Sequence, residues 1–161
     1  GDRHAYGELF TRWKGPIFSY LARRTGQVEA ASDLFQDVFM RVWRSAHTYR
    51  DKHAFRPWLF RIATNVVRDQ RRSAARLPEQ VEVDLEAMGV GSDPIGAVDL
   101  ERAIAQLPER LREAFILGAV HGMDHNEVGE ILEISPANAR ARISRARAQL
   151  RATIAGWRHA P

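Results

Sequence analysis

An arginine-rich segment near the C-terminal end of the chain carries side chains suited to binding phosphate. Residues 136–151 read PANARARISRARAQLR, and no acidic residue follows Glu133. Apolar residues recur through it at helical spacing, so we expect one face of a helix to pack inward while arginines project from the other faces. The inward face would be Ala139, Ile143, Ala146, Leu150 and Ile154, and the arginines are Arg140, Arg142, Arg145, Arg147 and Arg151.

The residues before this segment predict how the helix begins and what precedes it. Ser135 is a good helix N-cap, and Pro136 suits the first helical position. Residues 125–132 have the spacing of a short amphipathic helix, and Glu133 and Ile134 would form the turn between the two helices. This order is typical of a helix-turn-helix, whose second helix lies in the major groove of DNA.

Three further stretches in the N-terminal half have helical periodicity. No segment long enough for a β-strand shows alternating apolar and polar residues. Gly15 and Pro16 interrupt the first stretch, where we expect a kink or a break. The periodicity fades between 77 and 94, where proline, glycine and acidic residues predict a flexible linker. We therefore expect an all-α chain with two small helical domains, at 1–76 and 95–157, an acidic linker at 77–94 and a tail at 158–161.

The composition limits the class of protein. The 161 residues, 45% of them hydrophobic, suffice for one domain or two small ones with their own cores. The chain has no run of about 18 apolar residues and no signal peptide, so we expect a cytoplasmic protein without a membrane span. Because the sequence lacks cysteine, disulfides and thiolate zinc sites are excluded.

The net charge of +4 conceals an uneven distribution. Residues 1–76 contain 15 basic and 7 acidic side chains, residues 77–101 contain 7 acidic and no basic ones, and residues 102–161 contain 9 basic and 6 acidic ones. Two basic segments therefore flank an acidic connector. Arginine supplies 22 of the 24 basic residues, which suits bidentate contacts to phosphates and bases, although the codons of a GC-rich genome would produce the same bias.

Two parts of the chain resemble conserved regions of bacterial RNA polymerase sigma factors of the extracytoplasmic-function (ECF) type, in the sigma-70 family. Residues 33–43 (DLFQDVFMRVW) and 54–72 (AFRPWLFRIATNVVRDQRR) resemble the second region, and residues 107–150 resemble the fourth. The resemblance implies a region 2 helical bundle and a region 4 helix-turn-helix. It also implies a non-catalytic subunit that binds core RNA polymerase, recognises the minus-ten and minus-thirty-five promoter elements and initiates transcription of a specific regulon.

In this family, the second region and the loop before its last helix capture an unstacked base of the minus-ten element. The loop corresponds to residues 49–55 here, and Asn65 matches the family's asparagine. Phe55 and Trp58 also lie on the apolar face of their helix, so a purely structural role in the core is the alternative. The residues expected at minus-ten DNA are Tyr49, Phe55, Trp58, Arg61, Asn65, Arg68, Arg71 and Arg72.

The segment with Asp33, Gln36 and Asp37 resembles the family's surface for the polymerase clamp helices, and a solvated acidic face is the alternative. The family usually has acidic residues just before this aspartate, whereas residues 30–32 read Ala-Ala-Ser here. Phosphorylation of Ser32 would add about −1.5 to −2 of charge at neutral pH. Ser32 is therefore a candidate phosphosite, and equal binding of Ser32→Glu and Ser32→Ala proteins to core polymerase would refute that role.

The resemblance assigns the arginine-rich helix to the minus-thirty-five element. The family often has Gly-Thr-Val where this chain has Ala-Asn-Ala at 137–139, so the base preference stays open. Residues early in a recognition helix meet base edges, whereas Arg147 and Arg151 are expected on phosphates. The residues expected at minus-thirty-five DNA are Asn138, Arg140, Ala141, Arg142, Ser144, Arg145, Arg147 and Arg151.

No motif in the sequence predicts catalysis, a cofactor or a metal. His121 and His125 stand four residues apart, but Gly122 would break a helix between them, so we expect a surface turn rather than a metal site. The alternative function is a conventional helix-turn-helix regulator that binds DNA without polymerase. Dependence on core polymerase would distinguish the two.

The expected partners are core RNA polymerase, promoter DNA and an anti-sigma factor of the kind common in the family. Two promoter elements about two helical turns apart would lie roughly 70 Å from each other. A flexible linker of the predicted length has a root-mean-square span of only about 25 Å. We therefore expect a monomer that binds promoters weakly when free, because the polymerase would have to hold the two domains apart.

Overall fold

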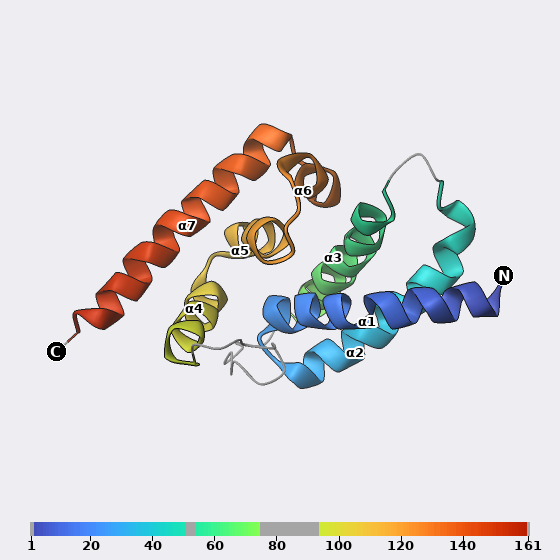
Figure 1. Ribbon diagram of the computed structural model, residues 1–161, viewed down its shortest axis with the longest axis horizontal. Coiled ribbons are helices and arrows are strands. Elements are labelled where there is room, and N and C mark those ends of the chain that lie inside the picture. The colour runs from blue at the N-terminus through green and yellow to red at the C-terminus, as the bar shows by residue number, and fades with distance from the viewer. Residues whose placement is uncertain (1, 51–53, 75–93, 161) are drawn as a thin grey trace.

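The computed structural model describes residues 2–50, 54–74 and 94–160, and these ranges form helices and no strands, as predicted. An N-terminal bundle consists of α1 (Arg3–Thr25), α2 (Val28–Ser45), the short η1 (Ala46–Thr48) and α3 (Phe55–Ala74). A C-terminal bundle consists of α4 (Pro94–Gln106), α5 (Glu109–Phe115), the π-helical turn η2 (Ile116–Val120), α6 (His125–Leu132) and α7 (Pro136–Arg158). Figure 1 shows the two bundles beside each other. The predicted linker at 77–94 lies outside the described residues except for its last residue, at which α4 begins.

The apolar faces of α1, α2 and α3 enclose one core. Asp2 caps α1 by accepting hydrogen bonds from the backbone N–H groups of His4 and Ala5, and Gly26 ends the helix with a left-handed φ of 71°. Burial of a large aliphatic side chain contributes about 1.5–3 kcal/mol, so this core is the main source of the bundle's stability. Its most buried apolar members include Ile17, Leu21, Ala31, Val38, Leu59, Ala63 and Val67.

Of the kink or break expected at Gly15 and Pro16, the break is wrong, because α1 continues through both residues. Proline removes one N–H from the helical hydrogen-bond ladder, which weakens a helix locally. Packing against α2 and the core stabilises the helical turns on either side of Pro16. Phe10 lies 4.9 Å from Phe39 of α2, measured between ring centroids, and Ile17 is fully buried. Tertiary contacts therefore outweigh the local preference.

The predicted helix-turn-helix is confirmed. As the sequence indicated, α6 begins at His125 and ends at Leu132, and α7 begins at Pro136. Asp124 and Glu127 form a capping box at α6, in which each side chain accepts a hydrogen bond from the other's backbone N–H, at 2.8 and 3.1 Å. The Ser135 hydroxyl accepts from the Asn138 N–H at 3.1 Å and caps α7. Each cap typically contributes about 1 kcal/mol.

The turn between α6 and α7 is tight. Glu133 ends α6 in the left-handed conformation, with φ 59°. A Cβ atom added at Gly129 would lie only 2.7 Å from the carbonyl oxygen of Ile134. Glycine at position 129 therefore allows the chain to turn close against α6 and fixes the direction in which α7 leaves.

The two bundles pack against each other, with α6 against α3 and with α4 and η2 against α1. A charged group lies at the centre of the interface. Arg24 of α1 is fully buried and donates to Glu109 at 2.6 Å and to Glu113 at 3.2 Å. Glu113, itself 3% exposed, is also approached by Arg68 of α3 at 3.0 Å and by Arg142 of α7 at 3.7 Å. These five residues, the interface cluster, connect α1, α3, α5 and α7.

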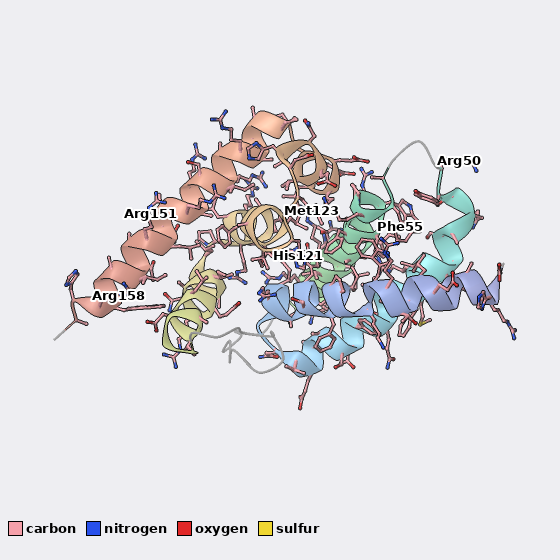
Figure 2. All side chains as sticks on the ribbon, viewed as in Figure 1. Arg50, Phe55, His121, Met123, Arg151 and Arg158 are labelled. Carbon is pink, nitrogen blue, oxygen red and sulfur yellow. The ribbon has the colours of Figure 1, made fainter. Side chains whose placement is uncertain are left out.

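His121 follows η2 and lies between the bundles (Figure 2). Its ring centroid is 5.8 Å from that of Tyr20 and 5.2 Å from that of Phe60, both in the N-terminal bundle. Gly122 breaks the helix as expected, but the surface position expected for His121 is wrong, because its ring packs into the interface. Burial, together with the positive charges of Arg23 and Arg56, lowers the pKa of His121 to about 4.

This lowered pKa predicts a loss of stability in acid. An unfolded histidine takes up its proton near pH 6.5, whereas His121 in the folded chain does so only near pH 4. Between these values the unfolded state binds more protons, so the free energy of unfolding decreases as the pH falls. We expect a decrease of about 2 kcal/mol between pH 7 and pH 5, measured by urea denaturation. A His121→Phe protein keeps an aromatic ring there and cannot titrate, so it should lose that much less. Equal losses in both proteins would contradict the assignment.

Candidate nucleic-acid interfaces

An aromatic group lies where α3 begins. The ring centroids of Tyr49, Phe55 and Trp58 are 5.2 to 5.6 Å from one another. All three side chains are half-buried, and they border an open pocket of about 550 Å³ whose walls also include Tyr6 and Trp43. The rings of Phe55 and Trp58 therefore contact the core and the pocket at once. Apolar walls of this kind can stack against a planar base.

The polar residues predicted on α3 extend along one side of the helix. Arg61, Asn65, Arg68 and Arg72 follow one another at intervals of three or four residues, and Asn65 is exposed. Such intervals place side chains on a common face. The structure therefore brings these polar residues into one row that starts beside the aromatic pocket.

Acidic side chains of the C-terminal bundle form ion pairs with most of the arginines that were predicted on α3. Arg61 pairs with Glu133 at 2.6 Å, and Arg68 pairs with Glu113 of the interface cluster at 3.0 Å. Arg71 pairs with Glu109 of the same cluster. Arg72 differs, since its contact, at 4.0 Å, is with Asp69 of its own helix.

Arg56 belongs to the same set of contacts and was missed by the sequence analysis. Its guanidinium donates to both carboxylate oxygens of Glu127, at 2.7 and 2.6 Å. Glu127 is 71 residues further along the chain, and no local pattern relates the two. A pairing between helices of different bundles leaves no periodic signal in the sequence.

A second basic surface lies on α7. Arg140, Arg145, Arg147 and Arg151 are exposed, and Figure 2 places Arg151 on the far side of the molecule from the N-terminal bundle. Asn138 and Ser144 are also exposed, and Ala141 is half-buried. Arg142 differs from the other arginines, because only 15% of its side chain is exposed and it faces Glu113. The residues predicted at minus-thirty-five DNA thus lie outside the buried face of α7, with Arg142 at the edge of that face.

The acidic residues of α2 lie on the surface. Asp33, Gln36 and Asp37 are exposed, and so is Ser32 at the preceding position. One turn further along, Met40 and Trp43 are 50% and 44% exposed, which is unusual for large apolar side chains. Exposed Trp and Met side chains are enriched at protein interfaces.

The described part of the chain contains neither a candidate metal site nor a helix that could span a membrane. No three His, Asp or Glu side chains there are grouped so that they could hold a metal ion. Among the same residues, no helix is long and apolar enough to cross a membrane.

Comparison with known proteins identifies both bundles. Residues 9–77 match the family model of Sigma-70 region 2, and residues 97–150 match that of Sigma-70, region 4. The RNA polymerase sigma factor NccH of Alcaligenes xylosoxydans xylosoxydans is 33% identical and aligns with 96% of this chain and 89% of its own length. The ECF RNA polymerase sigma factor SigE of Mycolicibacterium smegmatis is 32% identical over 96% of this chain and 65% of its own length.

A solved structure has the same fold. The sigma factor RpoE from Bartonella quintana, crystallised with the anti-sigma factor NepR, superposes with a TM-score of 0.82 over 93% of this chain and 96% of its own, at 22% identity. The helical architecture, the two region matches and the relatives agree with one another. The chain therefore belongs to the ECF group of the sigma-70 family, the promoter-recognising initiation subunits that associate with RNA polymerase.

Proposed function

We propose that the N-terminal bundle binds the minus-ten element with the basic face of α3 and the aromatic pocket beside it. The observation that supports this most strongly is the row of polar residues, mostly arginines, that begins at an open pocket lined by aromatic rings. Stacked rings would hold unstacked bases, and guanidinium groups would hold the backbone between them. The residues of this surface are Tyr49, Phe55, Trp58, Arg61, Asn65, Arg68, Arg71 and Arg72.

The second basic surface would read the minus-thirty-five element in the major groove. Its support is a capped helix with exposed arginines at its start and along its length. Asn138, Arg140, Ala141, Ser144 and Arg145 would face base edges, and Arg147 and Arg151 would face phosphates. Arg142 would join them only after leaving Glu113.

The acidic face of α2 would bind the clamp helices of core polymerase through Asp33, Gln36 and Asp37. Their exposure beside two exposed apolar residues supports an interface there. Ser32 lies exposed in the same helix, so its phosphorylation would add negative charge to the proposed interface.

We further propose that the protein is a cytoplasmic monomer when free, with no cofactor and no catalysis of its own, and that an anti-sigma factor restrains it. The Bartonella quintana sigma factor with the same fold was crystallised with such a factor, and this supports the last point.

Transcription start sites test the function directly. Purified core RNA polymerase is given fragmented genomic DNA with and without this protein, and the run-off transcripts are sequenced. We expect new, discrete starts that share two spaced upstream motifs. If no new starts appear and the protein alone binds specific DNA sites tightly, the chain acts as a conventional regulator and the proposal fails.

Two substitutions on α7 separate base reading from phosphate binding. If Arg140 contacts a guanine edge, Arg140→Ala should weaken binding to the cognate minus-thirty-five site by about 1–3 kcal/mol and relax specificity at one base pair. Arg151→Ala should weaken cognate and scrambled DNA alike and lower the salt dependence of binding. Both affinities are measured on holoenzyme by fluorescence anisotropy. Equal losses on the two DNAs for both variants would remove the distinction.

A further inference from the structure

One methionine lies on the outer surface of α2. Met40 is 50% exposed, whereas Met123 is only 4% exposed. The third methionine, Met88, lies outside the described residues. A large apolar side chain is stabilised when it leaves water, and half of the Met40 surface gains nothing of this kind from the fold. Its position therefore suits a contact with another molecule better than a role in the core.

Met40 shares a face of α2 with the residues proposed to bind polymerase. Gln36 and Asp37 stand three and four residues after Asp33, and Met40 stands four and three residues after them. Side chains at such intervals lie on one face of a helix. The helix packs into the core through a different face, whose buried residues are Ala31, Leu34, Val38, Phe39 and Val42. Met40 is thus an apolar member of an otherwise polar face.

An aromatic groove lies beside Met40. It is open, has a volume of about 560 Å³, and its walls include Phe10, Phe35, Phe39 and Trp43. The ring centroids of Phe10 and Phe35 are 4.9 and 4.8 Å from that of Phe39. A single exposed apolar side chain is ordinary on a protein surface, but an exposed methionine and tryptophan beside an aromatic groove are typical of a contact site. The polarisable thioether suits such a site, because its sulfur packs well against aromatic rings.

The exposed thioether is open to oxidation by a hydroperoxide such as hydrogen peroxide. The sulfur attacks one peroxide oxygen, so an S–O bond forms as the O–O bond breaks. The sulfur loses two electrons, and the remainder of the hydrogen peroxide takes them up and leaves as water. The chain has no cysteine, so no thiol of this protein competes for the oxidant. The product is a methionine sulfoxide, whose oxygen makes an apolar side chain polar.

A sulfoxide on this face would disfavour burial against a partner. A polar oxygen that leaves water without gaining a hydrogen-bond donor makes association less favourable. Because Met40 lies outside the buried face of α2, its oxidation would leave the core of the bundle in place. The chemical change would therefore affect binding rather than folding.

We propose that Met40 is an oxidation-sensitive contact residue for core RNA polymerase, and that its sulfoxide weakens the complex. The unoxidised thioether binds polymerase together with Asp33, Gln36 and Asp37. Methionine sulfoxide reductases convert the sulfoxide back to the thioether, so the loss is reversible. This inference rests on the proposed function, since it assumes that this face of α2 binds polymerase.

Peroxide treatment of two proteins tests the inference. Both carry Met88→Leu, and one of them also carries Met40→Leu, which keeps an apolar side chain of similar size and cannot form a sulfoxide. Each protein is treated with hydrogen peroxide, and catalase then removes the oxidant. Mass spectrometry of peptides quantifies each sulfoxide. Affinity for untreated core polymerase is measured by biolayer interferometry before treatment, after it, and after repair by reductases for both sulfoxide epimers.

We expect Met40 to be oxidised at least about tenfold faster than Met123, because oxidation follows exposure. Oxidation should weaken polymerase binding by the protein that keeps Met40 by about tenfold, and the reductases should restore it. The affinity of the Met40→Leu protein should be the same before and after peroxide. An equal loss in both proteins, or unchanged binding by protein oxidised at Met40, would overturn the inference. Equal oxidation rates for Met40 and Met123 would also overturn it.

A charge variant separates failure of the inference from failure of the function on which it rests. Asp33→Asn with Asp37→Asn neutralises two exposed acids of the same face and leaves Met40 in place. We expect this variant to bind core polymerase about tenfold more weakly than its parent. If it does, and oxidation of Met40 changes nothing, the inference alone is overturned. If neither change affects binding, the proposed role of this face fails as well.

Discussion

The arrangement of this sigma factor depends on the burial of one arginine. Arg24 has no exposed side-chain surface, and a buried guanidinium is tolerated only beside negative charge. Its partners, Glu109 and Glu113, belong to the other bundle. The buried charge of Arg24 is therefore neutralised only while the bundles are packed. Arg68 of α3 and Arg142 of α7 also approach the Glu113 carboxylate, so this one side chain links α5 to three other helices.

This constraint relates stability to function. Arginines that suit a DNA backbone also suit carboxylates, and this chain carries both on facing helices. Three of the α3 arginines pair internally, Arg61 with Glu133, Arg68 with Glu113 and Arg71 with Glu109. Under the proposed function, the same guanidinium groups would contact DNA.

Local signals in the sequence predicted local structure well. Spacing and capping preferences predicted where α6 ends, where α7 begins, the Ser135 cap and the all-helical class. The contacts between the bundles did not follow from it, since Arg24 and Glu113 are 89 residues apart. His121 was misplaced for the same reason, because its neighbours Tyr20 and Phe60 lie in the other bundle. The row on α3 was predicted as a set, but its occupation by acids was not.

The most direct test of this account is the distance between the bundles. Because the chain has no cysteine, spin labels can be attached at Thr11→Cys and Ala148→Cys, two exposed positions on α1 and α7. Pulsed electron paramagnetic resonance then gives the distance distribution for the free protein and for its complex with core polymerase and promoter DNA. The account predicts one narrow, short distribution for the free protein and a longer one in the complex. A broad or long distribution in the free protein, unchanged by polymerase, would contradict it.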